Sequence, residues 1–274
     1  MQKILLALFV LCATGCATVP AGKPDPRDPW EKFNRSMYVF NDSLDRAIAK
    51  PVAKGYKKVT PQIVRTGISN VITNLDQVST IVNALLQGKV KQAGNDSARF
   101  LLNSTLGLGG LFDPASAAGL DLNDEDFGQT LGKWGVKSGP YLMLPLLGPS
   151  TVRDTFARIP DQYTYPVNYL EDDSTRILIR GVDFIDLRAD LLDLDAQIER
   201  SYDSYAFIRN AWLQRREFLV RDGDVADESL DLEQEFLEDP APEEPQSEEP
   251  APEAPDTSRP PEAGQPTPPE QGAQ

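Results

Sequence analysis

Apolar side chains recur at helical spacing through the middle of the chain. The stretch Asp28-Pro29-Trp30-Glu31 combines a capping Asp, a Pro at the first helical position and a Glu three residues after the cap, which predicts a helix start. The apolar positions that follow, as far as Pro51, share one face: Trp30, Phe33, Met37, Phe40, Leu44 and Ile48. Similar stripes cover 63–75, 78–86, 100–102, 177–194 and 198–220. Because strand-type alternation is scarce, the pattern predicts an all-α domain over residues 28–221.

One apolar segment does not follow the helical pattern. Residues 126–150 read DFGQTLGKWGVKSGPYLMLPLLGPS, with five glycines and three prolines, and no charge occurs between Ser138 and Val152. Glycine and proline at this density break a long helix. We therefore expect an irregular, Gly/Pro-rich apolar loop here. No run of the mature chain reaches the roughly 18 apolar residues of a spanning helix.

The N-terminus predicts export and lipidation. Residues 1–15 have the charge, short apolar run and small residues of a signal peptide. Ala13-Thr14-Gly15-Cys16 resembles a bacterial lipobox, so Cys16 is the expected attachment site for lipid; the alternative is ordinary cleavage that leaves a free thiol. Cys12 is removed with the signal, so no disulfide is expected. Ala17 is not the Asp that retains many lipoproteins at the inner membrane, so a periplasm-facing, lipid-anchored position at the outer membrane is expected.

Residues 16–27 form the expected tether. The eleven residues from Ala17 to Arg27 span at most roughly 36 Å when fully extended. The folded body must therefore lie against the membrane.

The C-terminus differs from the body in charge and composition. Residues 222–274 carry 17 acidic side chains and one basic side chain, whereas the rest of the chain has a net charge of +1. From Asp239 onward, Pro and Glu dominate and large apolar residues are absent. Such a segment cannot bury enough apolar area to offset the entropy of ordering, which predicts a disordered tail. It is either a solvated spacer or an arm that recruits a partner.

A basic stripe marks the segment around Pro51. Arg46, Lys50, Lys54 and Lys58 are spaced by four, and no acid occurs between residues 46 and 65. If the helix continues across Pro51, these side chains share a face that can contact headgroup phosphates. A solvated helix face is the alternative interpretation.

Several chemistries are excluded or weakly supported. The chain has no histidine, which removes histidine-based nucleophilic triads and histidine metal sites. Residues 121–126 resemble the start of a calcium loop, but Asp126 and Gly132 stand where that loop needs Gly and Glu, so a polar loop and helix start are expected instead. The 107–110 Gly-rich stretch lacks the strand and Lys of a phosphate loop and predicts a sharp turn. We expect no metal, no cofactor and no nucleic-acid partner.

Read together, the motifs resemble those of a known family. The stretches DPWEKFNRSMYVFND, RFLLNSTLGLGGLFDPA, EDFGQTLGKWGVKSGPYLMLPLLGPSTVRD and RREFLV occur in order between about residues 28 and 222 and are similar to the MlaA (VacJ) outer-membrane lipoproteins of Gram-negative bacteria. The resemblance implies a ring-like bundle of amphipathic helices in the outer membrane, beside a trimeric porin and around a central channel. Misplaced outer-leaflet phospholipid would pass through the channel to a soluble periplasmic carrier of the Mla type, without catalysis.

Two other function classes stay open at this point. One is a membrane-anchored structural tether whose acidic tail recruits an envelope partner. The other is a lipid hydrolase that works with Asp or Glu, although the missing histidine disfavours it.

The transport interpretation assigns candidate residues to roles. The candidates for lipid contact or gating are Tyr141, Leu142, Met143, Leu144, Leu146 and Leu147. The candidates for the membrane interface are Trp30, Phe33, Phe40 and Trp134, and the candidates for headgroup contact are Arg46, Lys50, Lys54 and Lys58. The candidate hinges are Gly107, Gly109, Gly110, Gly132, Gly135 and Gly139.

Overall fold

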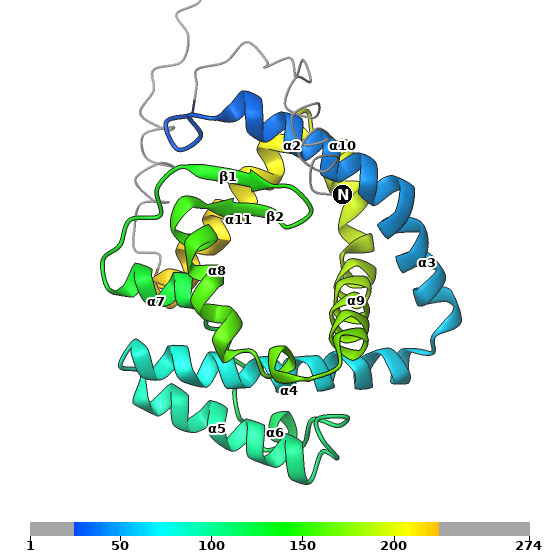
Figure 1. Ribbon diagram of the computed structural model, residues 1–274, viewed down its shortest axis with the longest axis vertical. Helices are drawn as coiled ribbons and strands as arrows, with labels where there is room; N and C mark the ends of the chain where they lie inside the picture. Colours follow the sequence, from blue (N-terminus) through cyan, green and yellow to red (C-terminus); the bar gives the residue numbers. More distant parts are fainter. Residues whose placement is uncertain (1–24, 225–274) are drawn as a thin grey trace, which may run out of the picture. The chain divides into compact units, whose positions relative to one another are not determined.

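The computed structural model describes residues 25–224, which are mainly helical (Figure 1). In chain order the elements are α2 (Glu31–Leu44), η1 (Asp45–Ala49), α3 (Lys50–Val59), α4 (Gln62–Leu86), α5 (Val90–Thr105), α6 (Pro114–Ala117), α7 (Phe127–Lys133), β1 (Tyr141–Leu144), β2 (Gly148–Thr151), α8 (Val152–Thr164), η2 (Pro166–Tyr169), α9 (Asp173–Asp190), η3 (Leu191–Leu194), α10 (Asp195–Arg200) and α11 (Ser204–Val220). Within this part of the chain, no helix combines the length and apolar character needed to cross a bilayer.

The first helical arm runs without interruption through Pro51. The segment η1 is a π-helix, in which the Lys50 N–H donates to the Asp45 carbonyl five residues earlier. Proline lacks an N–H and its ring crowds the carbonyl four residues back, so a local widening lets the helix continue into α3. The arm ends at Thr60, whose extended backbone is the conformation favoured before Pro61.

The helix start differs from the expectation in one respect. The helix begins at Glu31, and Asp28 does not cap it, because no side chain caps this end. Instead Asp28 is buried and accepts hydrogen bonds from Asn34 (2.7 Å), Arg209 (3.1 Å) and the Tyr205 hydroxyl. The acid therefore joins the start of α2 to α11.

The helices α4 and α5 form a hairpin at the base of the described body. Two apolar stripes, 63–75 and 78–86, belong to the single helix α4. The helix ends where Gly88 adopts a positive φ and the Lys89 N–H donates to the Ala84 carbonyl at 2.9 Å, which is a common helix-terminating arrangement. The chain then reverses, and α5 packs along α4.

The segment expected to be irregular contains a short β-hairpin, which corrects the expectation for these residues. Strand β1 pairs antiparallel with β2, in a register that places Tyr141 opposite Thr151 and Leu144 opposite Gly148. Strand alternation buries Tyr141 and Met143 and leaves Leu142 and Leu144 half-buried. All four residues of β1 are apolar, so no alternation of apolar and polar residues marked a strand in the sequence.

The outer edge of β1 is closed by side chains of α2. Asn34 donates to the Tyr141 carbonyl (3.0 Å) and accepts from the Met143 N–H (2.8 Å). Seven residues further along α2, Asn41 donates to the Leu144 carbonyl and accepts from the Leu146 N–H, both at 2.8 Å. A primary amide offers the same donor and acceptor as a neighbouring strand, so these two residues satisfy the free edge of the hairpin.

The remaining helices complete a ring (Figure 1). Helix α9 packs against α3 and α4, and α8 returns from the hairpin toward α4. The stripe expected over 198–220 is interrupted, because Asp203 caps a new helix, α11, by accepting from the Ala206 N–H. Helix α11 passes behind the hairpin, where Tyr205 joins a small core with Met37, Tyr141 and Met143.

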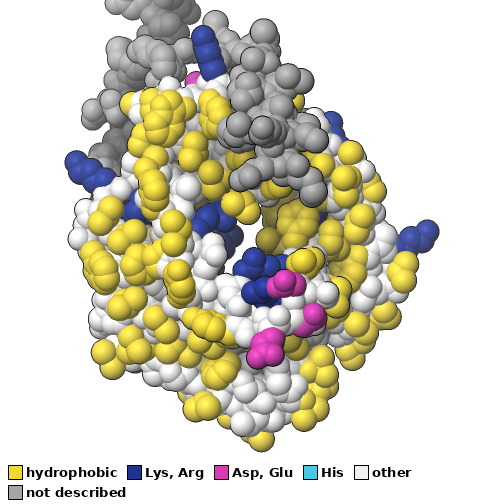
Figure 2. All heavy atoms as spheres, viewed as in Figure 1, with side chains coloured by type: hydrophobic (Ala, Val, Ile, Leu, Met, Phe, Trp, Pro, Cys, Tyr) yellow, Lys and Arg dark blue, Asp and Glu magenta, His cyan; other side chains and the backbone are white. Residues whose placement is uncertain are grey.

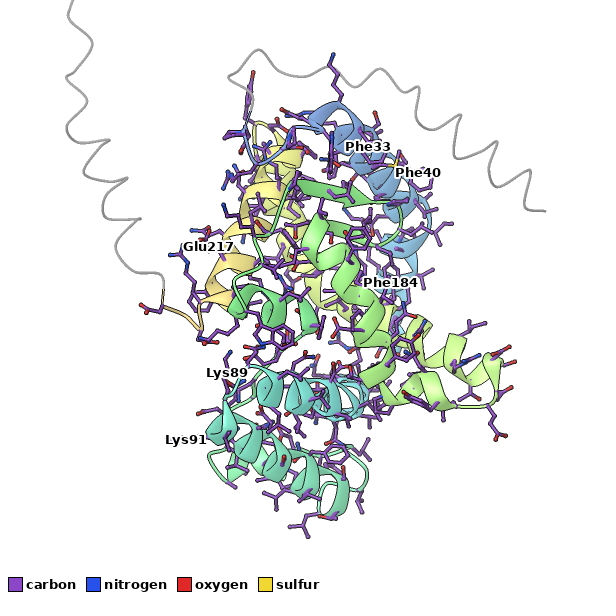
Figure 3. The ribbon with its side chains drawn as sticks, turned by 60° about the vertical axis from the view of Figure 1, so that its left-hand side comes forward. Phe33, Phe40, Lys89, Lys91, Phe184 and Glu217 are labelled. Carbon is purple, nitrogen blue, oxygen red and sulfur yellow. The ribbon has the colours of Figure 1, made fainter. Side chains whose placement is uncertain are left out.

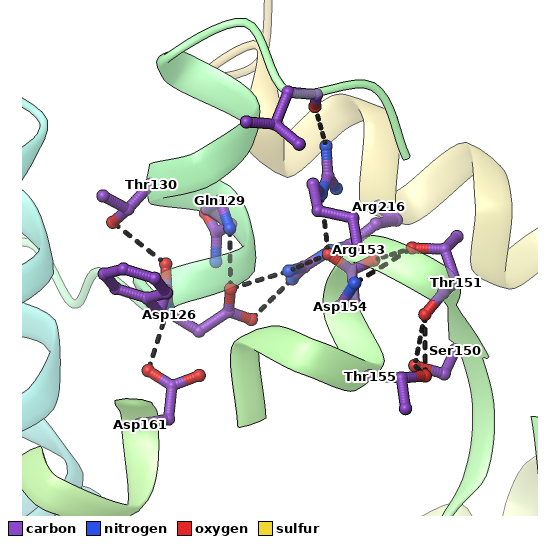
Figure 4. Close-up of polar contacts among 12 residues, drawn as sticks. Asp126, Gln129, Thr130, Ser150, Thr151, Arg153, Asp154, Thr155, Asp161 and Arg216 are labelled. Atoms are coloured by element: carbon purple, nitrogen blue, oxygen red, sulfur yellow. Dashed lines mark hydrogen bonds and ion pairs between the residues drawn. The ribbon is translucent and has the colours of Figure 1, made fainter. Parts of the chain in front are cut away.

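A second polar network holds α7, α8 and α11 together (Figure 4). Arg216 of α11 makes ion pairs with Asp126, the cap of α7 (2.5 Å), and with Asp154 of α8 (2.9 Å). Arg153 binds Asp154 from the other side at 2.9 Å. Asp126 thus caps the helix start that was expected for this polar loop. Among residues 25–224, no group of three or more acidic, His or Cys residues is arranged to hold a metal ion.

Candidate functional site

An amphipathic cavity lies where α2, η1, the hairpin turn and α9 meet. Its larger part is a hollow of about 730 Å³ with a mainly apolar wall. The apolar side chains of this wall are Leu44, Ile48, Ala49, Leu146, Pro149, Phe184 and Ile185. Phe184, Ile48 and Leu146 are each at least half exposed, which is unusual for large apolar side chains at a hollow and favours an apolar ligand.

The smaller part of the cavity carries charged side chains on a wall that is otherwise mainly apolar. A hollow of about 270 Å³ shares Asn41, Asp45, Gly148, Pro149 and Arg188 with the apolar hollow. Beyond these shared residues its charged walls are Asp42, Arg46, Lys50, Asp195 and Glu199. The cavity therefore joins an apolar hollow to one whose wall also carries charged side chains. Figure 2 shows Lys and Arg side chains gathered around a hollow at the centre of one face of the ring.

Arg188 is the central cation of this cavity. It makes ion pairs with Asp45 (2.7 Å) and Asp195 (2.9 Å) and so links α9 to η1 and α10. Hydrogen bonding to Asp45, with the charges of Asp45 and Asp195, raises the pKa of Arg188. Burial by itself raises the pKa of Asp195, but Lys50 and Arg188 together hold it below its ordinary value. The cluster is thus fully charged at neutral pH and gives the cavity a fixed polar wall.

The hairpin turn forms one edge of the cavity. Leu146 has a φ of 66°, a left-handed conformation that is unfavourable for a residue with a side chain. Its N–H is held by Asn41, and its side chain is 63% exposed beside the apolar hollow. The α2 helix therefore fixes an apolar side chain of the turn at the edge of the cavity.

The six candidates for lipid contact differ in how deeply their side chains are buried. Tyr141 and Met143 are at most 2% exposed and belong to the core, although Met143 also lines the smaller hollow. Leu142 and Leu144 are half-buried, whereas Leu146 and Leu147 are exposed. The physical reason is the strand, which sends alternate side chains to opposite faces. Lipid contact stays a prediction for all six, and Leu146 and Leu147 are the two whose exposure suits it.

The four aromatic candidates lie on the surface or close to it. Trp30, Phe33 and Trp134 are exposed and Phe40 is half-buried. Figure 3 shows Phe33 and Phe40 on α2, at the opposite end of the described body from the start of α5. Trp134 packs its ring edge-on against Phe127 and donates to the Leu86 carbonyl at 3.1 Å. Their contact with a membrane interface stays a prediction.

The basic stripe is divided by the fold. Lys50 faces the cavity and pairs with Asp195 (3.0 Å) and Glu199 (3.1 Å), and Arg46 pairs with Asp42 at 3.0 Å. Lys54 and Lys58 are exposed on α3. Headgroup contact stays a prediction for all four, and Lys54 and Lys58 are the two that project from the body.

The candidate hinges include positions where backbone segments approach closely. A Cβ at Gly107 would lie 2.4 Å from the Asn103 and Phe112 carbonyl oxygens, and one at Gly110 would lie 2.7 Å from the Asn74 Cβ. Gly132 is similarly tight against Val220. Close packing at these three positions explains why they are glycines, with no need for a hinge motion. Gly109, Gly135 and Gly139 instead lie in turns where φ is positive. A hinge role stays a prediction.

The remaining candidates lie outside the described residues. These are the signal peptide, Cys16 with its tether up to residue 24, and the tail from residue 225.

Sequence reasoning missed Phe184, Ile185 and Arg188 as site residues. Their only signal was membership of the 177–194 apolar stripe, in which Arg188 interrupts the apolar positions.

A ring of helices around a cavity with one apolar and one charged wall defines a class of protein suited to an amphipathic ligand. The chain belongs to the MlaA lipoprotein family, whose sequence model matches residues 26–219. It is 38% identical over 224 residues to the intermembrane phospholipid transport system lipoprotein MlaA of Escherichia coli, covering 80% of this chain and 89% of that one. It is 33% identical over 246 residues to the Haemophilus influenzae protein of the same name, covering 87% and 98%.

A solved structure agrees with these relatives. A chain from work on the structural basis for maintenance of bacterial outer membrane lipid asymmetry matches with a TM-score of 0.65 and 38% identity. The match covers 70% of this chain and 98% of that one. The ring-like helical fold expected from the sequence is confirmed by this match.

Proposed function

We propose that this protein is an outer-membrane lipoprotein, anchored through Cys16, that removes misplaced phospholipid from the outer leaflet. The phospholipid passes through the amphipathic cavity and is handed to a soluble periplasmic carrier for return to the inner membrane. A trimeric porin holds the ring in place. The proposal involves no catalysis and no cofactor, in keeping with the relatives, whose name describes phospholipid transport.

The observation that carries the proposal is the joined apolar and charged cavity. A phospholipid has apolar chains and a charged headgroup, and the two hollows offer a wall for each. Acyl chains gain about 25 cal/mol for each Å² of apolar surface removed from water, so contact with Phe184 and Ile48 stabilises them in the larger hollow. The headgroup then lies beside Arg188, Lys50 and Asp195 in the smaller hollow.

The outer surface supports a position within a membrane leaflet. Large apolar side chains are exposed on the α4–α5 hairpin and the loop that follows it, including Leu101 (61%), Leu106 (71%), Leu108 (69%) and Phe112 (53%). Contiguous apolar surface of this kind marks a membrane or protein interface in a folded protein. With the short tether to Cys16, it supports embedding of the ring rather than suspension in the periplasm.

The cationic side chains of α3 provide a second contact with the membrane. Lys54 and Lys58 project from the body, on the arm that also exposes Val52 and Val59. Lysines beside apolar residues bury their stems and place the ammonium groups near headgroup phosphates. We assign these two lysines to headgroup contact.

The test is the outer-leaflet phospholipid content of intact cells that lack this gene, with and without a plasmid copy. The proposal predicts that the content rises on deletion and returns to normal with the plasmid. A copy with Cys16→Ala should restore it poorly because the anchor is lost. Unchanged outer-leaflet phospholipid on deletion would contradict the proposal and favour the tether hypothesis.

A further inference from the structure

We propose a second lipid-binding site: a groove on α7, the 134–140 loop and α11 that binds the phosphodiester of a lipid headgroup. The groove has a volume of about 650 Å³, and none of its lining residues lines the amphipathic cavity. This site goes beyond the proposed transport function and does not depend on it. Glu217, labelled on α11 in Figure 3, marks its outer wall.

The groove is lined by cations from four separate segments of the chain. Arg27 precedes α2, Lys137 lies in the loop, Arg153 begins α8, and Arg216 and Arg221 belong to the end of α11. The acids that pair with four of them are Asp25, Asp126, Asp154 and Glu217. Lys137 makes no ion pair within residues 25–224, so one positive charge is left uncompensated. This one uncompensated positive charge matches the single negative charge of a phosphodiester.

Arg216 supplies a donor that the protein itself does not use. Its two Nη atoms bind Asp126 and Asp154, but its Nε is buried and has no hydrogen-bond partner among residues 25–224. A buried donor without a partner costs free energy. Because this Nε has almost no exposed surface, a headgroup in the groove reaches it only when the Arg216 side chain turns toward the ligand. Arg65 and Arg99 also have buried, unpartnered Nε atoms, but of the three only Arg216 lines a cavity described above.

The other walls of the groove suit the uncharged part of a lipid. Pro26, Val136, Leu213 and Val220 form apolar surface beside the cations. A free inorganic phosphate has no part that would contact this surface, whereas the glycerol and the first methylenes of a phospholipid do. The ten residue-to-residue steps from Cys16 to Pro26 span at most roughly 33 Å, so the groove also lies within reach of the leaflet that holds the anchor.

The test is an NMR titration of the full chain, held in a zwitterionic detergent, with dihexanoyl phosphatidylglycerol at constant ionic strength. The reporters for the groove are the amides of Gly135 and Gly139 and the Nε–H of Arg216, and the amide of Gly181 reports on the amphipathic cavity. We expect saturable shifts of the groove reporters. Lys137→Gln should weaken this binding about fivefold, because it removes the uncompensated charge, while the exposed control Lys91→Gln on α5 should leave it unchanged.

Three results would decide against the site. The absence of a saturable shift at the groove reporters would overturn it, and so would equal affinities of Lys137→Gln and Lys91→Gln. Saturation of the same reporters by inorganic phosphate at the same concentrations would overturn the lipid headgroup as the ligand. Phe184→Asp should abolish the Gly181 shift and leave the groove shifts intact, so failure of the transport proposal and failure of this site are distinguishable.

Discussion

Asn34 and Asn41 lie seven residues apart on one face of α2 and bind the same edge of β1. Each amide donates to a carbonyl and accepts from an N–H of the hairpin, at distances between 2.8 and 3.0 Å. A two-stranded hairpin is only marginally stable alone, and its unpaired edge is open to other strands. Helix α2 therefore sets the position of the turn, and with it the position of Leu146 at the amphipathic cavity.

Loss of one of these amides should loosen the hairpin. Asn41→Ala leaves the Leu144 carbonyl and the Leu146 N–H without their partner, which costs about 1–3 kcal/mol for a buried group, and about 1–2 kcal/mol here because Asn41 is half-buried. Urea unfolding of the full chain measures the effect. Ser43→Ala, on the same helix but exposed, is the matched control and should stay within about 0.5 kcal/mol of the wild type. Equal midpoints for the two variants would show that the amide does not hold the turn.

Asp76 should make stability depend on pH. Burial, with the negative charges of Asp183 and Asp124, raises the pKa of Asp76 to about 7. The folded protein then holds the proton more tightly than the unfolded chain, whose Asp has an ordinary pKa of about 3.9. The contribution of this bound proton to the free energy of unfolding is fully present below about pH 4 and is lost as the pH rises through 7.

A variant without the charge tests this expectation. Asp76→Asn keeps an acceptor for Tyr165 and removes the buried charge, so its melting temperature should exceed that of the wild type by about 2–4 °C at pH 8. At pH 5, where wild-type Asp76 is already protonated, the two melting temperatures should agree. The same difference at both pH values, or a less stable variant at pH 8, would rule out Asp76 as the source.

The acidic tail distinguishes the transport proposal from the tether hypothesis. A chain that ends after Asp239 keeps the ring and loses most of the tail. The transport proposal predicts that this chain restores outer-leaflet phospholipid nearly as well as the full chain, because no residue of the amphipathic cavity is removed. Complete loss of complementation, with normal protein levels on an immunoblot, would favour a tail that recruits a partner.

The sequence predicted the helices well because each buries one apolar stripe. The 3.6-residue period predicted α2, α9 and the two apolar stripes of α4, whereas continuation of the helix through Pro51 was only a condition for the basic stripe. The hairpin was missed because the four residues of β1 are all apolar and alternate only in burial, which the sequence does not show. Asn34 and Asn41 gave no signal, since an Asn in a helix indicates a partner only when the strand beside it is known.

The site was harder to predict than the fold. In a ring of helices set in a membrane, apolar side chains face the surrounding lipid as well as the interior of the ring. Helical periodicity therefore identifies an apolar stripe but does not show which of the two surfaces the stripe faces. Phe184 and Leu187 belong to one stripe of α9 and are 50% and 58% exposed, yet only Phe184 lines the amphipathic cavity. Arg188 is identified as a site residue only through its ion pairs with Asp45 and Asp195. Asp195 is near Arg188 in the sequence, but Asp45 is far from it, so the sequence alone does not bring the three together.

That difference on α9 provides the most direct test of transport through the cavity. Cells that lack the gene receive plasmid copies encoding the wild type, Phe184→Asp or Leu187→Asp, at protein levels matched by immunoblot, and outer-leaflet phospholipid is measured. A carboxylate at position 184 lies against the acyl chains in the apolar hollow, so Phe184→Asp should fail to lower the phospholipid content while Leu187→Asp lowers it to the wild-type level. Full restoration by Phe184→Asp would contradict passage of phospholipid through this cavity.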